Sequence, residues 1–399
     1  MHILILGAGY AGIRAAIELD NLPVELHEHF HVTVVDRNPY HQHIVLLHNV
    51  ATGYRNVDDV VIPMSRILQR RSTRFVQGTV THINPLEHAV QLDNGFTLTY
   101  DRLVIALGAT ADDAGVPGVR EHTIPLRSFA EATHLHDHIT AQFAQAAIIN
   151  DVCKQRTLLT FVIIGGGFTG VQLAGELAHW NRALAERHHI NSTQARTLLI
   201  ERGDRLLAQF GAWATIEAEQ VLRQRSIDIR MHTTVQHVRP GAVTIQHQSP
   251  TNPMTEETIE AATIVWAGGV RAPALVAEAG LPTDQRGRVL VDRYLRVQGE
   301  AAIFAAGDCA RVPDVQGRII AGTASYAMRQ GEHLAQALLA DVLGQAPRPY
   351  QPQHLGQLVS LGPDEAIGNP LGVPTSGLPA SLLKRGVEAW YLTTLEKFL

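Results

Sequence analysis

Two short stretches of the 399-residue chain carry glycines at the spacing G-x-G-x-x-G, each directly after a short apolar run. The two sets are Gly7, Gly9 and Gly12, and Gly165, Gly167 and Gly170. The first glycine of such a set permits a tight turn, the second lets the backbone approach a pyrophosphate, and the third lets a helix pack closely on the preceding strand. The helix that follows presents free N–H groups and its positive dipole end to a phosphate. The spacing therefore predicts two dinucleotide sites.

An acidic residue ends the next apolar run after each turn. The run VTVVD ends at Asp36, and the run TLLIE ends at Glu201. A carboxylate at this position can accept hydrogen bonds from ribose hydroxyls, and it favours the free 2′-hydroxyl of NADH over the 2′-phosphate of NADPH. Arg202, the next residue, could instead pair with a phosphate. We favour NADH at the second site.

A further carboxylate follows a later apolar stretch, AIFAAGDCA at 302–310. A strand leading into Gly307-Asp308 would place the Asp308 carboxylate beside a polyol chain such as the ribityl of FAD. Two dinucleotide sites in one chain suggest hydride transfer between a nicotinamide and a flavin. The sequence therefore predicts FAD at the first site and NADH at the second.

The sequence of the elements that must position these residues is also repeated in the two parts of the chain. VTHINP at 80–85 is echoed by VQHVRP at 235–240, and LVIALG at 103–108 by IVWAGG at 264–269. We expect an α/β chain with two Rossmann-type dinucleotide-binding domains, each with a small antiparallel insertion. A C-terminal strand and helix region should follow, with long helices from about Ala324 to Leu343 and from Pro379 to Phe398.

The expected segments divide the chain into four parts. They are an FAD-binding domain, first part, at 1–112, an NADH-binding domain at 113–270, a return segment of the FAD-binding domain at 271–345, and a C-terminal region with an amphipathic helix at 346–399.

The composition of the chain argues against several classes of partner and of function. A formal net charge of −5 gives no electrostatic reason to expect nucleic acid. The two cysteines, Cys153 and Cys309, lack the spacing of a redox dithiol, which argues against a disulfide reductase. The sequence shows neither a signal-peptide pattern nor an apolar run of about 18 residues, so we expect a cytoplasmic protein.

Longer motifs around these residues resemble a known family. They are YHQHIVLLHNVATG at 40–53, IIGGGFTGVQLAGEL at 163–177, IVWAGGVRAP at 264–273, FAAGDCA at 304–310 and TASYAMRQG at 323–331. The chain resembles the pyridine nucleotide–disulfide reductase superfamily and, within it, the type II NADH dehydrogenases, which pass electrons from NADH through FAD to a quinone. The resemblance extends from residue 3 to about residue 391, and the first and last motifs are its most specific signatures.

The resemblance implies a role for each matching position. The residues implied to hold FAD are Gly7, Gly9, Gly12, Asp36, Val80, Gly108 and Asp308. Those implied to hold NADH are Gly165, Gly167, Gly170, Glu201 and Gly268. The helix starting near Ala324 would point its positive end at the flavin's pyrimidine edge, and Ser325 and Tyr326 would line the quinone side. Peripheral contact with the inner face of the cell membrane and a homodimer are further expectations.

Three departures from the family pattern concern the electron acceptor. Gln172 stands where the family usually has a glutamate tied to the quinone pocket and to proton supply, and glutamine cannot ionise. Ser325 replaces a usual glutamine, and Arg271 replaces a common lysine. We count Gln172, Arg271, Ser325 and Tyr326 as candidate catalytic residues, with water or Tyr326 as alternative proton sources.

The departures leave two alternatives to a quinone reductase. One is an NADH-dependent flavoprotein reductase with a soluble redox protein, oxygen or another small molecule as acceptor. The other is a flavoprotein that senses NADH, like relatives of apoptosis-inducing factor, and changes its association when reduced.

Two further patterns each allow a structural and a functional interpretation. His27, His29 and His31 alternate, so a strand would project them to one side, where they could bind a metal. They lie where we expect a connection from a helix to a strand, so we prefer a solvated polar edge and expect no metal. In the last helix Leu383, Val387, Trp390 or Tyr391, Leu395 and Phe398 share one face. That face would dock on the body or a second subunit, or anchor the protein at a membrane surface.

Overall fold

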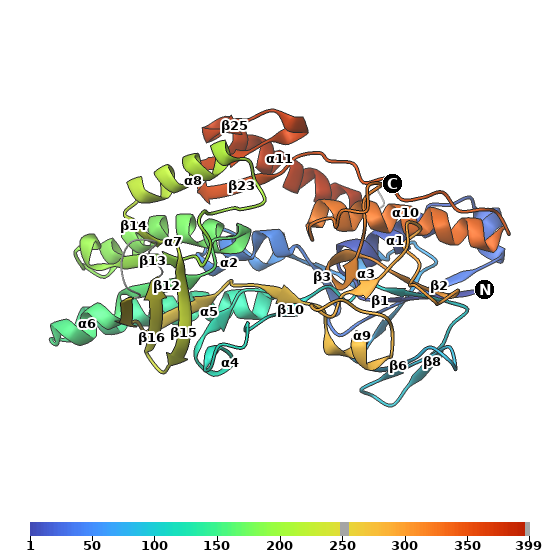
Figure 1. Ribbon diagram of the computed structural model, residues 1–399, viewed down its shortest axis with the longest axis horizontal. Helices are drawn as coiled ribbons and strands as arrows, with labels where there is room; N and C mark the ends of the chain where they lie inside the picture. Colours follow the sequence, from blue (N-terminus) through green and yellow to red (C-terminus); the bar gives the residue numbers. More distant parts are fainter. Residues whose placement is uncertain (248–254, 396–399) are drawn as a thin grey trace.

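The computed structural model describes residues 1–247 and 255–395, and it contains two parallel five-stranded sheets side by side (Figure 1). The first sheet has the order β21-β9-β1-β2-β5, with the strands Ile303–Ala305, Arg102–Ile105, His2–Leu6, His31–Asp36 and Arg74–Gln77. The second has the order β11-β18-β12-β13-β14, with the strands Ile124–Pro125, Thr263–Trp266, Thr160–Ile164, Arg196–Ile200 and Ile227–Arg230. The predicted fold of two Rossmann-type units is confirmed.

The repeated sequence forms repeated structure. The central strands β1 and β12 are almost entirely buried, as expected of parallel strands covered on both faces. They lead into α1 (Tyr10–Asp20) and α7 (Phe168–Arg187) through the two glycine-rich turns. We call the part of the chain around the sheet of β1 the first half and the part around the sheet of β12 the second half. Each half also carries a three-stranded antiparallel insertion. These insertions are β6 (Val80–Asn84), β7 (Ala89–Leu92) and β8 (Thr97–Thr99), and β15 (Thr233–Arg239), β16 (Ala242–His247) and β17 (Thr255–Glu260).

Two crossings between the halves lie side by side. Strand β10 (Thr110–Ala111) leaves the first half and pairs with β19 (Val270–Arg271), which returns to it. These crossings lie beside the boundaries that we predicted at 112 and 270. After the return, β21 completes the first sheet, and α10 (Ala324–Val342) packs along α1. The division into four segments stays a prediction.

The C-terminal region covers both halves. Strands β23 (Leu358–Gly362), β24 (Glu365–Gly368) and β25 (Thr375–Ser376) form a sheet, and β23 runs along α7. Helix α11 (Gly377–Leu395) crosses from this sheet toward the first half, along the upper edge in Figure 1. It begins two residues before the predicted Pro379, and Phe398 lies outside the described residues.

The remaining elements complete the two halves. They are β3 (Tyr40–Gln42), α2 (Leu47–Ala51), β4 (Val61–Pro63), α3 (Met64–Ile67), α4 (Val119–His122), α5 (Phe129–Ile148), α6 (Val152–Leu158), α8 (Ala212–Gln224), α9 (Ala274–Glu278), β20 (Val289–Leu290) and β22 (Ala310–Arg311). None of the described helices is long and apolar enough to cross a membrane.

The histidine-rich stretch is not a strand. Residues Val24–Glu28 form a 3-10 helix between α1 and β2, and only His31 belongs to β2, so the stretch connects a helix to a strand as expected and the three imidazoles do not share one side of a strand. His31 instead stacks on His2 with ring centroids 4.4 Å apart.

Candidate functional site

In the first glycine-rich turn, a side chain would clash with the backbone at two of the three glycines and would meet free space at the third. Gly7 has φ of 102°, and a Cβ there would lie 2.3 Å from the Ala106 carbonyl oxygen. A Cβ on Gly12 would lie 1.9 Å from the Gly7 oxygen. Gly9, by contrast, has nothing within 4 Å of its Cβ direction, and it caps α1 without any side-chain hydrogen bond. Free N–H groups at the start of α1 therefore face an open space where a pyrophosphate fits.

The second turn repeats this geometry. Gly165 has φ of 113°, and a Cβ there would lie 2.6 Å from the Ala267 carbonyl oxygen. A Cβ on Gly170 would lie 1.9 Å from the Gly165 oxygen. Gly167 is open and caps α7 without a side-chain hydrogen bond. The two turns therefore share one geometry, in which an open glycine begins a helix that has no side-chain cap.

Each strand-end carboxylate is bound to its own glycine turn. Asp36 Oδ2 accepts a hydrogen bond from Ala8 N at 2.8 Å, and its Oδ1 accepts one from Asn38 N at 2.8 Å. Glu201 repeats the pattern at 2.6 Å, with Oε2 on Gly166 N and Oε1 on Gly203 N. Because a carboxylate has about four acceptor sites, both acids keep lone pairs for ribose hydroxyls.

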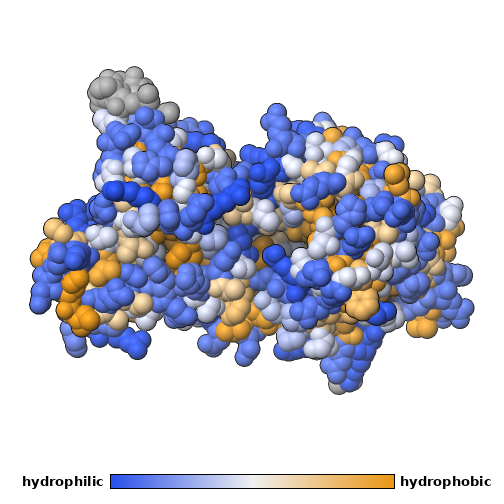
Figure 2. Space-filling model, turned by 90° about the horizontal axis from the view of Figure 1, so that it is seen from below, coloured by the Kyte–Doolittle hydropathy of each residue, from blue (hydrophilic) through white to orange (hydrophobic). Residues whose placement is uncertain are grey.

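Between the halves lies a cavity of about 270 Å³ with a charged lining. Asp308 lines it from the short 3-10 turn after β21, and Arg127 from the other half places a guanidinium nitrogen 3.9 Å from the Asp308 carboxylate. Burial raises the pKa of Asp308, and the charge of Arg127 opposes that rise. Arg288 lines the cavity but is paired with Asp284, whereas Arg271 and Arg286 line it without an ion pair within 4.0 Å among the described residues, so the cavity suits an anionic ligand. The face in Figure 2 is visibly hollowed between two lobes.

The candidate catalytic residues are placed in three different settings. Arg271 and Tyr326 line the cavity, and the Tyr326 hydroxyl lies 2.6 Å from His354 Nδ1. Ser325 is exposed at the start of α10 and is not part of the cavity lining. Gln172 is buried on α7, where its Nε2 lies 3.3 Å from His48 Nε2, and it also lies outside the lining.

The remaining predicted contacts lie at the ends of strands. Val80 begins β6 and is half-buried, and Gly108 follows β9 with φ of 65° and open space at its Cβ position. Gly268 follows β18 and is exposed beside the Trp266 ring. Ala324 is the first residue of α10, whose cap is the Thr323 side chain.

Several buried polar groups near these turns are not apparent from the sequence pattern. Arg127 sits one residue before a Ser128–Glu131 capping box, which marks a helix start but not a cavity. Tyr391 Oη lies 2.8 Å from His41 Nε2, although the two residues are 350 positions apart. Glu176 is buried one turn beyond Gln172. Only the fold brings these groups together.

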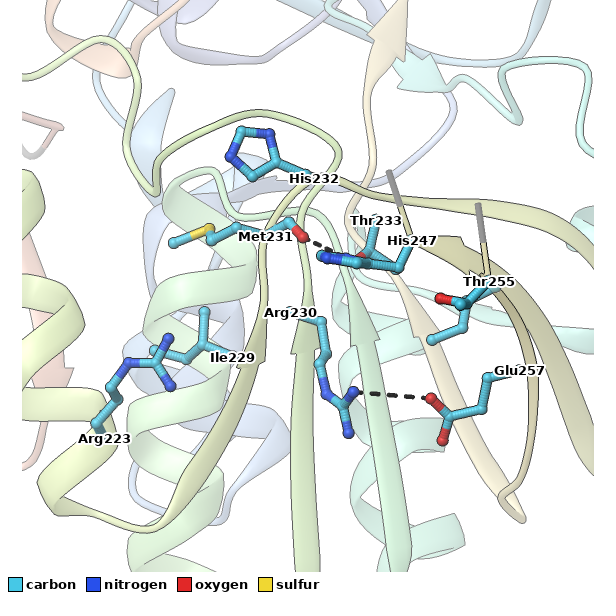
Figure 3. A pocket seen from close by; sticks show the side chains of 10 residues that line it. Arg223, Ile229, Arg230, Met231, His232, Thr233, His247, Thr255 and Glu257 are labelled. Carbon is cyan, nitrogen blue, oxygen red and sulfur yellow. Dashed lines mark hydrogen bonds and ion pairs between the residues drawn. The ribbon is translucent and has the colours of Figure 1, made fainter. Parts of the chain in front are cut away.

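A second cavity, of about 260 Å³, lies at the edge of the second half (Figure 3). Its charged side chains are already engaged: Arg230 pairs with Asp228 and with Glu257, and Arg223 pairs with Glu219. We therefore place the functional site in the cavity between the halves.

Comparison with known proteins agrees with this geometry. The family model described as pyridine nucleotide-disulphide oxidoreductase matches residues 1–331. The chain belongs to this family. The match confirms the oxidoreductase class and the pair of dinucleotide folds that the glycine turns predicted.

Members of the family are similar to almost the whole chain. A type II NADH:quinone oxidoreductase of Staphylococcus aureus is 28% identical over 387 residues, which cover 97% of this chain and 94% of that protein. NDH2 of Plasmodium falciparum, solved in complex with NADH, has a TM-score of 0.88 at 16% identity, covering 99% of this chain and 95% of that one. The sulfide:quinone oxidoreductase of Aquifex aeolicus has a TM-score of 0.80 at 19% identity, covering 99% and 91%.

Proposed function

We propose that the chain is an NADH:quinone oxidoreductase of type II, which uses FAD to pass two electrons from NADH to a quinone. The observation that carries the proposal is the pair of equivalent glycine turns, one in each half and each with its own bound carboxylate, together with the cavity between the halves. The similarity to type II NADH:quinone oxidoreductases over 97% of the chain supports the quinone as acceptor.

The first half would hold FAD. The open Gly9 position and the free start of α1 would bind its pyrophosphate, Asp36 its adenosine ribose and Asp308 its ribityl chain. Val80 and Gly108 would border the same cofactor. Bound there, FAD would accept a hydride from NADH and release electrons to the acceptor.

The second half would hold NADH. The open Gly167 position would bind the pyrophosphate and Glu201 the adenosine ribose, with Gly268 beside the nucleotide. Arg271 lines the cavity between the halves and would pair with a phosphate or steady the nicotinamide end. Because hydride transfer depends on proximity and orientation, this half of the reaction needs no acid or base from the chain.

The acceptor side would be formed at the start of α10. Ala324 begins the helix, and its free N–H groups would stabilise negative charge on a reduced flavin. Tyr326 lines the cavity and is held by His354. Ser325 is exposed at the outer side of this helix start, where an acceptor would approach.

Anaerobic titration tests this function in two stages. NADH should bleach the flavin spectrum of the purified protein, and a pulse of menadione should restore it. Ferricyanide and oxygen serve as comparison acceptors. Fast flavin reduction followed by negligible reoxidation with menadione would contradict the quinone acceptor, and a protein that cannot bind FAD would contradict the whole assignment.

We further propose that α11 attaches the protein to a membrane surface. One side of the helix is buried and includes Tyr391 and Leu395. The other side carries five large apolar side chains that are each 42–56% exposed: Leu378, Leu382, Leu383, Val387 and Trp390. The single apolar face that we predicted is therefore wrong. The helix docks on the body with one side and leaves the other available for a lipid interface.

Point substitutions test the membrane proposal better than deletion of the helix, because Tyr391 is part of the buried structure. Val387→Ser with Trp390→Ser should release the protein from anionic liposomes in a flotation assay while FAD content stays unchanged. The matched control is Val315→Ser, a similarly exposed apolar residue outside α11. Unchanged flotation with a loss of dimer mass in sedimentation would assign the surface to a second subunit instead.

A further inference from the structure

Helix α7 carries a buried carboxyl group that the function above does not use. Glu176 is only 3% exposed, and its Oε1 accepts a hydrogen bond from Asn49 Nδ2 at 3.3 Å. The Ser360 hydroxyl lies 3.1 Å from the same oxygen. No ion pair within 4.0 Å includes Glu176 among the described residues. A buried carboxyl held by neutral groups is suited to exist as an acid as well as an anion.

The Ser360 hydroxyl can serve both forms of Glu176. It lies 2.9 Å from the Gly362 carbonyl oxygen as well as 3.1 Å from Glu176 Oε1. When Glu176 is ionised, Ser360 can donate to the carboxylate. When Glu176 is protonated, Ser360 can donate to Gly362 and accept from the carboxyl group. Both protonation states therefore find hydrogen-bond partners without any movement of the backbone.

Glu176 also lies on the helix face that leads to the cavity. Phe168 lines the cavity, and Gln172 and Glu176 follow at intervals of four residues, so the three share one face of α7. Eight residues of helix separate Phe168 from Glu176, a rise of about 12 Å. His48 lies beside this face, 3.3 Å from Gln172, and precedes the Asn49 that donates to Glu176.

The charged and titratable groups nearest Glu176 come from three helices, α2, α8 and α11. Arg225 at the end of α8 and Lys384 of α11 are the charged groups that act on Glu176. His48 of α2 precedes Asn49, which donates to Glu176. Burial raises the pKa of Glu176, while Ser360, Lys384, Arg225 and Asn49 oppose the rise. Burial also lowers the pKa of His48, so its imidazole is neutral and can accept a proton on one nitrogen and release it from the other.

We propose that Glu176 supplies the proton that Gln172 cannot supply. The proposal rests on the quinone reductase function, whose balance is NADH + H⁺ + quinone → NAD⁺ + quinol. NADH provides two electrons and one proton as a hydride, so one more proton must come from the protein. The O–H bond of Glu176 breaks, an O–H bond forms on the quinol by way of His48, and the carboxylate then takes a proton back from solvent. Glu176 acts through another residue and does not touch the acceptor.

An infrared titration tests the acid directly and needs no turnover. The C=O stretching band of a protonated carboxyl should persist in the wild type at about pH 6, where surface glutamates have ionised. The band should be missing from Glu176→Gln and present in Glu186→Gln, which removes an exposed glutamate from the same helix. A wild-type spectrum without such a band would overturn the proposal.

A comparison of two acceptors tests the transfer. Ferricyanide takes electrons without protons, whereas menadione needs both. Glu176→Gln should slow reoxidation by menadione at least about tenfold and leave reoxidation by ferricyanide within about twofold. The double variant Gln172→Glu with Glu176→Gln moves the carboxyl one turn toward the cavity and should recover most of the menadione rate. Glu186→Gln should match the wild type with both acceptors.

The outcomes separate this proposal from the function on which it rests. A wild type that reduces ferricyanide but not menadione would contradict the quinone function, whatever Glu176 does. A wild type that reduces menadione as fast as Glu176→Gln does would contradict the role of Glu176 alone. Equal slowing with both acceptors would show structural damage in place of proton supply, and it would also overturn the proposal.

Discussion

The hydroxyl of Tyr391 lies 2.8 Å from Nε2 of His41, and Nδ1 of the same imidazole lies 2.7 Å from the Ala8 carbonyl oxygen. Because a carbonyl only accepts, Nδ1 carries the proton and Nε2 accepts from Tyr391. Burial lowers the pKa of His41 to about 4, so the ring is neutral at pH 7. One imidazole therefore joins the last helix to the first glycine turn.

Removing the Tyr391 hydroxyl should weaken FAD binding. Tyr391→Phe leaves Nε2 of the buried His41 without a donor, at a cost of about 1–3 kcal/mol. Part of that cost should appear in the FAD site, because His41 is bonded to the glycine turn through Ala8. Fluorescence titration of the apoprotein with FAD should show a Kd raised several-fold. Tyr54→Phe removes an exposed hydroxyl near the same helix and should leave the Kd unchanged; equal effects would contradict the coupling.

Substitution of the open glycine Gly9 should weaken cofactor binding and leave the stability of the fold unchanged. Gly9 has ordinary negative φ and free space at its Cβ, so Gly9→Ala should leave the melting temperature of the apoprotein within about 2 °C. The added methyl would block the approach of a pyrophosphate, so the Kd for FAD should rise strongly. Gly211→Ala, at the cap of α8, is the matched control and should change neither quantity. A Gly9→Ala protein that keeps full FAD content would contradict the site.

The fold could be predicted because the sequence repeats it. Strand, glycine turn, helix and terminal acid recur in both halves, and each local pattern agrees with the same βαβ geometry. The antiparallel insertions followed from the paired motifs at 80–85 and 235–240. Helix boundaries were within two residues where a cap or a glycine marks the end, as at Ala324 and Gly377.

The long-range contacts could not be predicted, because they depend on how the halves and the C-terminal region pack. Nothing in the local sequence relates Tyr391 to His41 or Arg127 to Asp308. The two sides of α11 were also misjudged. Helical periodicity groups Leu383 with Leu395, yet Leu395 is buried and Leu383 is exposed, because only part of the apolar surface meets the body.

The Glu201 carboxylate should control NADH binding and leave FAD binding unchanged. Glu201→Gln keeps the size but replaces one acceptor oxygen by an NH₂ group that faces the backbone N–H of Gly166 or Gly203. Loss of a hydrogen bond to a charged group costs about 1.5–3 kcal/mol, so KM for NADH should rise about 10–100-fold. Steady-state kinetics at saturating acceptor measures this. Asp204→Asn changes an exposed neighbour and should leave KM unchanged, and a lowered FAD content in Glu201→Gln would contradict the separation of the two sites.

The buried His43 should make stability fall with acid. Burial, with smaller contributions from His41, Lys384 and Arg55, lowers the pKa of His43 to about 3, whereas in the unfolded chain it is about 6.5. Between these values only the unfolded chain binds the proton, so the folded state is fully stabilised above about pH 6.5 and loses about 1.4 kcal/mol per pH unit below it.

A histidine substitution isolates this contribution. His43→Gln cannot take up the proton, so the wild type should lose about 2 kcal/mol more than the variant between pH 7 and pH 5 in urea unfolding. His29→Gln removes an exposed histidine and should follow the wild-type curve. Parallel curves for the wild type and His43→Gln would mean that His43 is protonated in the folded protein. In that case its hydrogen bond with the Tyr10 hydroxyl would run from the imidazole to the oxygen, because both ring nitrogens would then be donors.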